Sequence, residues 1–180
     1  MLKYQQKAKN FMCSCLVKGD INTHKTSGGL IYRQSWNTMY FVTSVAFFAT
    51  TYSDYLTSAR KYLKCSCGSV SSNELLSFSV DYILGDNLRA RSYMVGCGNN
   101  NPRQVHNKAF SLISFKKGER SSSPYGALIG GPDAYDNFTD QTYIYEQTEP
   151  ATYNNALFIT VLARLHACQN DYNQLLLGIF

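Results

Sequence analysis

The residues best suited to chemistry lie in an acid-rich stretch, residues 133–156, which reads DAYDNFTDQTYIYEQTEPATYNNA. This stretch holds five of the twelve acidic residues of a chain whose net charge is +5. Carboxylates gathered in this way are typical of general acid–base catalysis, of a metal-binding loop or of a solvated turn. Composition alone leaves these three interpretations open. The five residues are Asp133, Asp136, Asp140, Glu146 and Glu149.

A second candidate is the loop SYMVGCGNNNPRQVHNKAFS at residues 92–111, where His106 follows a turn rich in glycine and asparagine. Arg103 and Lys108 flank this histidine. Histidine suits proton transfer near neutral pH. A hydrogen-bonded structural histidine fits the same pattern equally well, so the loop by itself does not decide between the two roles.

The spacing of the acidic and sulfur-bearing residues does not predict a metal site. A calcium loop needs oxygen ligands at closely alternating positions, and Asp133, Asp136 and Asp140 do not alternate in that way. Two cysteine pairs are C-x-C, and no histidine follows them at zinc-finger spacing. The sequence therefore predicts no metal and no cofactor, and it leaves open free buried thiols or one or two longer disulfide bridges. The six cysteines are residues 13, 15, 65, 67, 97 and 168.

The composition predicts one folded domain, residues 1–180, because 44% of the residues are apolar and can build a core. The lysines and arginines are scattered without a basic stripe, so nucleic-acid binding is not expected. Fourteen tyrosines suit a polar-ring ligand such as a carbohydrate, and they suit ordinary packing too. No apolar run is long enough for a signal peptide or a membrane span, so neither is expected in this chain.

Helical periodicity predicts the elements that position these loops. Residues 2–16 carry apolar side chains three and four positions apart, which predicts an amphipathic helix. Residues 38–63 are apolar almost all round in their first half, which predicts a helix buried on most faces, with two strands as the alternative. Ser71 and Glu74 form a capping pattern and Gly85 is a stop signal, so a helix is expected between them.

The second half of the chain is predicted to be irregular until its last helix. Residues 86–135 contain three of the four prolines and show little periodicity, and long loops of this kind are usually functional or disordered. Pro150 precedes a helix for which Asn154 or Asn155 is the expected cap. One face of that helix is predicted to carry Leu157, Val161, Leu162 and Leu165.

Two long, spaced motifs resemble the active-site signatures of glycoside hydrolase family 9. Residues 92–106 look like the first signature, at Ser92, Met94, Val95, Gly98, Asn100, Val105 and His106. The chain is similar throughout to the C-terminal part of plant endo-β-1,4-glucanases, from KAKNFMCSCL through SGGLIYRQSWN, VDYILGDN and GGPDAYDNF to YNQLL. Residues 138–156 match the second signature in full, at Phe138, Asp140, Tyr145, Glu149, Ala151, Asn155 and Ala156.

The resemblance implies an all-α fold, part of an (α/α)6 barrel of six helical hairpins whose loops form the substrate cleft. Residues 1–180 are expected to be the C-terminal portion of that catalytic domain, without its N-terminal portion. The implied activity is that of an inverting endo-β-1,4-glucanase, a cellulase acting on cellulose or another β-1,4-glucan. Glu149 is the expected general acid, and His106 and Asp140 are the other expected catalytic residues, holding sugar hydroxyls and the local charge network. The expected substrate-binding residues are Arg103, Lys108, Tyr145 and Tyr153.

An inverting glycosidase also needs a carboxylate that activates water from the opposite face of the sugar. The resemblance places this base on a segment of the Asp-Ala-Gly-Asp kind near the start of the family's domain, and these 180 residues contain no such segment. We therefore expect little turnover from this chain alone. The alternative is a catalytically inactive remnant that at most binds β-glucan.

Four positions depart from the family pattern. Lys108 and Thr142 stand where the family has arginine, Leu88 where it has proline, and Asn107 where a second histidine is common. Lysine keeps the charge of arginine but loses its planar pair of donors. The resemblance also implies a secreted or cell-wall location, and residues 137–139 form an N-glycosylation sequon that we expect to be unused.

Overall fold

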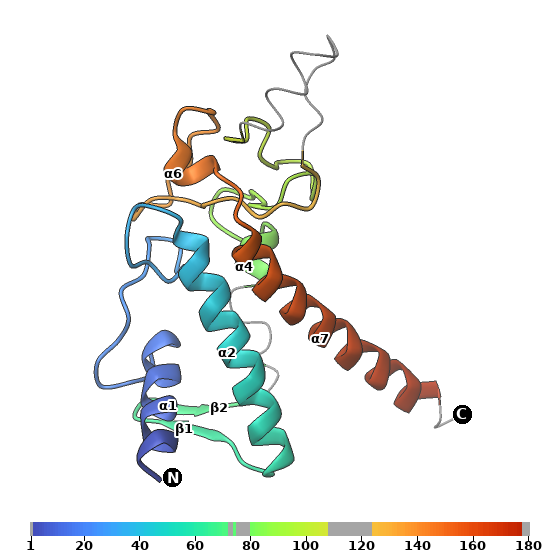
Figure 1. Cartoon of the computed structure of the whole chain (residues 1–180). Helices are drawn as coiled ribbons and strands as arrows, with labels where there is room; N and C mark the ends of the chain where they lie inside the picture. The colour runs from blue at the N-terminus through green and yellow to red at the C-terminus, as the bar shows by residue number, and fades with distance from the viewer. Residues whose placement is uncertain (1, 72–73, 75–79, 108–123, 178–180) are drawn as a thin grey trace. The chain divides into compact units, whose positions relative to one another are not determined.

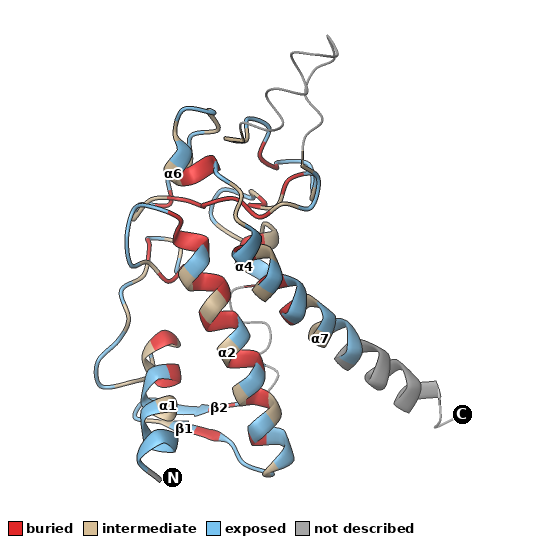
Figure 2. Ribbon diagram, viewed as in Figure 1, coloured by how far each residue is buried: buried red, intermediate tan, exposed pale blue. Residues whose placement is uncertain are grey.

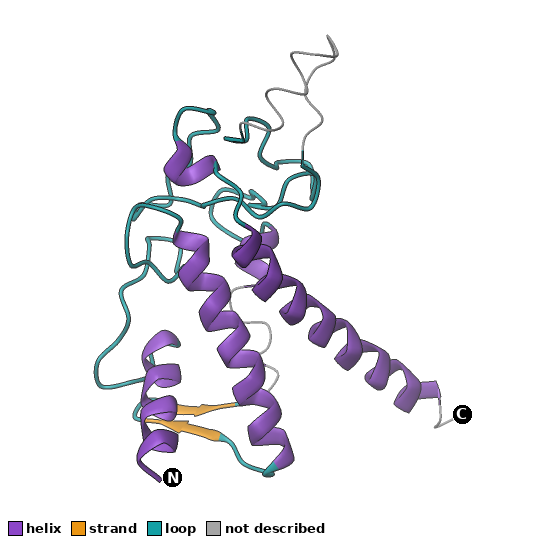
Figure 3. Ribbon diagram, in the orientation of Figure 1, coloured by secondary structure: helices purple, strands orange, loops and turns teal. Residues whose placement is uncertain are grey.

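The computed structural model describes residues 2–71, 74, 80–107 and 124–177 of the chain (Figure 1). The structure is rich in helices, as the sequence predicts (Figure 3). The chain forms two compact units. The first contains Met1–Asn22, Val45–Phe78 and Ala156–Phe180, and the second contains Thr23–Ser44 and Ser79–Asn155. The prediction that residues 1–180 form one domain stays a prediction.

The first helix, α1, spans Leu2–Cys15, one residue short of the predicted range. Its apolar side buries Met12, Cys13 and Cys15, while the residues of its first turns are mostly exposed. The helix itself is confirmed, but burial is confined to its last turns, since Tyr4 is 76% and Phe11 46% exposed although both belong to the predicted apolar face. The chain turns away directly after the helix, where Val17 has a left-handed φ of 59°.

The second helix, α2, spans Thr38–Ser58, and most residues of its first half are buried (Figure 2). Two of its buried threonines donate their hydroxyls to carbonyls one turn earlier: Thr43 to Met39 at 2.8 Å and Thr50 to Ala46 at 2.9 Å. These bonds satisfy polar groups that would otherwise be costly to bury. The helical prediction is confirmed for this segment, and the two-strand alternative is wrong.

A short hairpin follows α2 where the sequence predicts continued helix to residue 63. The helix stops earlier because Arg60 takes a left-handed φ of 52°, which breaks the helical path. Strand β1 (Leu63–Cys65) pairs antiparallel with β2 (Gly68–Val70), so that Leu63 lies opposite Val70. Strands of three residues are too short to show a period of two, and the sequence pattern therefore does not reveal them.

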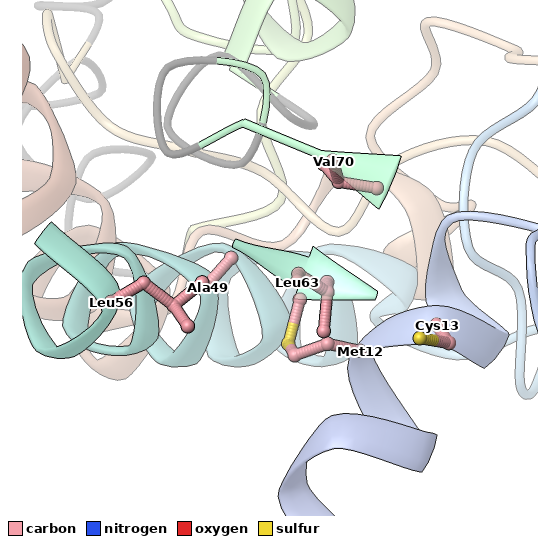
Figure 4. Close-up of a cluster of buried hydrophobic side chains, with 6 residues drawn as sticks. All are labelled: Met12, Cys13, Ala49, Leu56, Leu63 and Val70. Atoms are coloured by element: carbon pink, nitrogen blue, oxygen red, sulfur yellow. The ribbon is translucent and has the colours of Figure 1, made fainter. Parts of the chain in front are cut away.

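The core of the first unit joins α1, α2 and this hairpin (Figure 4). Each of its side chains is at most 3% exposed, and the disulfide between Cys13 and Cys65 ties α1 to β1. The sequence leaves the cysteine pairing open, and the structure assigns the bridge between Cys13 and Cys65. Cys67 and Cys97 carry free thiols. The core cluster comprises Met12, Cys13, Ala49, Leu56, Leu63 and Val70.

The second unit is mostly loop (Figure 3). Its short helices are α4 (Val80–Leu84) and α6 (Tyr145–Thr148). The predicted helix after Ser71 falls partly on residues 72–73 and 75–79, which lie outside the described residues. Its expected cap is present, because the Glu74 N–H donates to Ser71 Oγ at 3.2 Å. Its expected stop is present too, since Gly85 follows α4 with a φ of 125°.

The last helix, α7, spans Thr152–Leu177 and begins before the predicted cap. Asn155 holds a neighbouring loop instead, accepting from the Leu128 N–H at 2.9 Å, and Asn154 donates to Asn37 Oδ1 at 2.8 Å. The capping prediction is therefore wrong, because both amides serve contacts distant in sequence. Val161 is buried as predicted. None of the described helices is long and apolar enough to cross a bilayer.

We expect removal of the Cys13–Cys65 bridge to destabilise the first unit. The two cysteines are 52 residues apart, and on the chain-entropy model a loop of this length stabilises the native state by about 4 kcal/mol. Alanine at both positions avoids burying a hydroxyl in the core. Urea unfolding followed by circular dichroism should show a clearly lower midpoint for Cys13→Ala/Cys65→Ala.

The matched control is Cys67→Ala, which changes an exposed free thiol next to the same hairpin. Its unfolding midpoint should equal that of the original chain. Equal midpoints for the double variant and the original chain would contradict a stabilising role for the bridge.

Candidate active site

Two carboxylates of the acid-rich stretch build the loop rather than face a ligand. Asp133 Oδ1 accepts from the backbone N–H groups of Tyr135 and Asn137, each at 2.8 Å, and so closes a turn. Asp136 is only 2% exposed. It accepts hydrogen bonds from the Gly28 N–H and the Tyr82 hydroxyl. Both carboxylates are therefore part of the scaffold.

The tyrosine that donates to Asp136, Tyr82, is stacked on a second tyrosine, Tyr93. The rings of Tyr82 and Tyr93 lie 6.1 Å apart and nearly parallel, and Phe138 packs edge-on against Tyr93 at 5.6 Å. Burial raises the pKa of Tyr93 to about 12, and burial together with the bond to Asp136 raises the pKa of Tyr82. Tyr82 therefore keeps its proton and remains a donor to Asp136.

Asp140 joins the acid-rich stretch to the loop that precedes His106. Its Oδ2 accepts from the Arg103 N–H at 2.8 Å and its Oδ1 from the Gln104 N–H at 2.9 Å. The Arg91 guanidinium, which lies over the Phe138 ring, is 3.8 Å from Oδ2. Both oxygens are thus engaged by backbone amides, and Asp140 fixes where the histidine loop lies.

His106 is held by two backbone carbonyls of the acid-rich stretch. The ring atom Nδ1 lies 2.7 Å from the Thr142 carbonyl oxygen. The backbone N–H of His106 donates to the Thr148 carbonyl at 3.1 Å. A carbonyl can only accept, so Nδ1 carries the proton and Nε2 is left for a ligand. The imidazole packs against the Tyr145 ring at 5.9 Å. Because Thr142 acts here through its carbonyl, the departure from arginine at this position does not affect the contact.

The short helix α6 is clamped from two sides. Gln147 accepts from the Thr139 N–H at 2.8 Å and donates to the Asn137 carbonyl at 3.0 Å. On the other side the Glu146 carbonyl lies against Gly130, where a Cβ atom would come within 2.3 Å of that oxygen. Only glycine permits this approach. The end of α6, and with it Glu149, is therefore fixed by close packing.

Glu149 differs from the other four carboxylates of the stretch in its exposure, since each of those is buried or partly buried. It follows α6 directly, and its N–H donates to the Tyr145 carbonyl at 3.0 Å. Its side chain is exposed and has no hydrogen-bond partner in the part of the chain that the structure describes. The neighbouring Tyr145 has a raised pKa, mainly because of Glu146 and to a smaller extent because of Glu149. Glu149 is thus free to meet a ligand beside Tyr145 and His106.

The structure brings together only some of the predicted site residues. The contacts described above link His106 to Tyr145 and to the Thr148 carbonyl just before Glu149, and they link Asp140 to the loop of His106. Tyr153 instead packs edge-on against Tyr40 at 5.3 Å, and its hydroxyl accepts from Asn37 at 2.7 Å. Arg103 contributes its backbone N–H to Asp140, with an exposed side chain. Lys108 lies outside the described residues.

Sequence reasoning missed the residues that support these side chains. Arg91, Gln147 and Asn37 act through contacts with residues distant in sequence, and their own neighbourhood does not reveal them. The pair Gly130-Gly131 is a visible signal, since adjacent glycines often mark close backbone approach. The part of the chain that the structure describes contains no group of three or more histidine, cysteine or acidic side chains able to hold a metal ion.

Comparison with known proteins gives a consistent set of relatives. The family model "Glycosyl hydrolase family 9" matches residues 1–162. Endoglucanase 19 of Arabidopsis thaliana is 54% identical, covering 98% of this chain and 32% of the relative. Endoglucanase 15 of Oryza sativa subsp. japonica is 44% identical, over 92% of this chain and 30% of its own. The chain thus spans about a third of the length of the curated relatives it matches.

Solved structures agree with the sequence relatives. The endoglucanase of the termite Nasutitermes takasagoensis matches with a TM-score of 0.74 at 27% identity, covering 94% of this chain and 38% of its own. Endoglucanase CelQ of Clostridium thermocellum, complexed with cellobiose and cellotriose, matches with a TM-score of 0.64 at 31% identity. The match covers 82% of this chain and 24% of CelQ. From the family model and the identity to its relatives, the chain belongs to glycosyl hydrolase family 9.

Proposed function

We propose that this chain supplies the acid side of an inverting endo-β-1,4-glucanase site, with Glu149 as the general acid. The observation that carries the proposal is the different engagement of the carboxylates. Asp133, Asp136 and Asp140 each accept at least two hydrogen bonds from this protein, whereas Glu149 is exposed and has no such partner among the described residues. An acid that protonates a glycosidic oxygen has to reach that oxygen directly.

The reaction needs two carboxylates on opposite faces of the sugar. In an inverting enzyme one carboxylic acid protonates the leaving oxygen while a carboxylate about 6.5–9.5 Å away activates water. In our proposal Glu149 performs the first step. The base is assigned to none of the 180 residues, since they contain no Asp-Ala-Gly-Asp segment.

The surrounding residues bind and orient the sugar. His106 offers Nε2 toward a sugar hydroxyl, because its Nδ1 is engaged by Thr142. Tyr145 is 46% exposed and offers a ring face. Asp140 acts as a positioning residue, since it holds the backbone of residues 103–104 and thereby the loop of His106. Arg103, Tyr153 and Lys108 remain proposed substrate-binding residues.

The substrate, the barrel and the location belong to the same proposal. The cello-oligosaccharides in the CelQ structure support a β-1,4-glucan substrate such as cellulose. Helix-rich relatives with TM-scores up to 0.74 support a part of an (α/α)6 barrel. The Cys13–Cys65 disulfide supports a secreted or cell-wall location, because such bridges persist mainly in oxidising compartments.

We expect Glu149→Gln to abolish most hydrolysis of carboxymethyl cellulose. Glutamine keeps the shape of the side chain but cannot give up a proton, and loss of general acid catalysis costs about a hundred- to ten-thousand-fold in kcat. The assay uses this chain alone and this chain grafted in place of the matching segment of Endoglucanase 19 from Arabidopsis thaliana. Release of reducing ends is the readout.

The matched control is Glu146→Gln, three residues earlier on α6, which should retain most activity. If the grafted enzyme hydrolyses carboxymethyl cellulose equally well with Glu149→Gln, Glu149 is not the general acid. If the chain alone binds cellohexaose by titration calorimetry but releases no reducing ends, it acts as a binding remnant by itself.

We expect Asp140→Asn to lower kcat of the grafted enzyme about ten- to hundredfold, because a hydrogen bond to a charged group contributes roughly 1.5–3 kcal/mol. Asparagine has one acceptor oxygen, so one of the two N–H groups of residues 103–104 would face another donor. The His106 loop should then shift while the fold stays intact.

Asp133→Asn is the matched control, since Asp133 also accepts two backbone N–H bonds at 2.8 Å but within its own turn. Its kcat should stay close to that of the original enzyme. Equal losses in the two variants would mean that Asp140 matters only for general stability of the stretch.

A further inference from the structure

A polar pocket lies in the first unit and contains no residue of the proposed active site. It has a volume of about 490 Å³. Residues of α1, of the last turns of α2 and of the segment after α2 line it. Its charged and aromatic members are Lys3, Lys9, Lys61, Tyr52, Tyr55 and Tyr62.

The positive charge of this pocket is not neutralised by any ion pair among the described residues. No carboxylate is among its lining residues, and its three lysines form no ion pair with any residue that the structure describes. Asp54, the acidic residue of α2 close in sequence to the pocket tyrosines, is engaged by Arg164 at 2.9 Å. Three unpaired ammonium groups around one pocket create a site that favours an anion.

The tyrosines give the pocket flat surfaces as well as charge. Tyr62 is 71% exposed and Tyr55 is 39% exposed. The rings of Tyr52 and Tyr55 lie 5.8 Å apart, and Gln5 donates to the Tyr55 hydroxyl at 3.2 Å, which restrains that ring. Exposed tyrosine faces pack against rings while their hydroxyls bond polar groups.

We propose that this pocket binds an acidic polysaccharide, a polyuronate whose pyranose rings each carry a carboxylate. The ring faces would lie on Tyr55 and Tyr62, and the carboxylates would meet Lys3, Lys9 and Lys61. A neutral glucan would gain nothing from three unpaired lysines. A nucleic acid would need a longer basic track for its phosphates, and the charge here is confined to one pocket. The pocket shares no residue with the Glu149 site, so the two proposals fail independently.

The test is titration calorimetry of the full chain with hexagalacturonate and with its methyl ester, which has the same rings without charge. We expect hexagalacturonate to bind and the ester to bind far more weakly. Lys3→Gln/Lys61→Gln should weaken binding of hexagalacturonate about tenfold, since two solvent-screened ion pairs with the ligand are lost. Tyr62→Ala should weaken it several-fold.

Two controls match these changes. Lys7→Gln removes a lysine of α1 that does not line the pocket, and Tyr4→Ala removes an α1 tyrosine that is 76% exposed. Both should bind hexagalacturonate like the original chain, and circular dichroism checks that every variant is folded. The proposal is overturned if hexagalacturonate does not bind or the ester binds as well. Polyglutamate or single-stranded DNA binding equally tightly, or Lys7→Gln weakening binding as much as the pocket variant, would also overturn it.

Discussion

The candidate site depends on the carboxylate of Asp140. Its two oxygens accept the N–H groups of residues 103 and 104 and so join two loops that are distant in sequence. The histidine loop has no regular secondary structure in its described residues, so its position has to come from such contacts. The carbonyls of Thr142 and Thr148 then fix His106 itself. Asp140 thus fixes the backbone just before His106, and the two carbonyls fix His106 beside Tyr145.

The acid-rich stretch shows how one composition serves several purposes. Asp133 holds the turn, Asp136 holds the buried tyrosine pair and Asp140 holds the other loop, whereas Glu149 is exposed and accepts no hydrogen bond from the described residues. A buried carboxylate without partners would be costly, so the engaged residues had to receive donors. The exposed position of Glu149 after α6 removes that requirement and leaves its oxygens available.

Sequence patterns predict the long helices and nominate the site residues, but they do not show how these residues are held. Periodicity located α1 and α2 and the start of α7 to within a few residues, because apolar spacing is a local signal. The hairpin after α2 and the four-residue α6 are too short for such a signal. The spaced motif singled out Asp140 and Glu149 from their neighbours. That Asp140 acts through backbone amides depends on contacts across more than thirty residues, which no local pattern encodes.

The central claim is that Glu149 protonates the leaving oxygen. The most direct measurement is kcat/KM of the grafted enzyme on aryl β-cellobiosides whose leaving groups differ in pKa, with Glu149 and with Glu149→Gln. An acid catalyst makes the rate nearly independent of the leaving group, because protonation compensates for a poor one. We predict that kcat/KM depends only weakly on the leaving-group pKa with glutamate at position 149 and steeply with glutamine. The same slope in both enzymes would contradict the assignment.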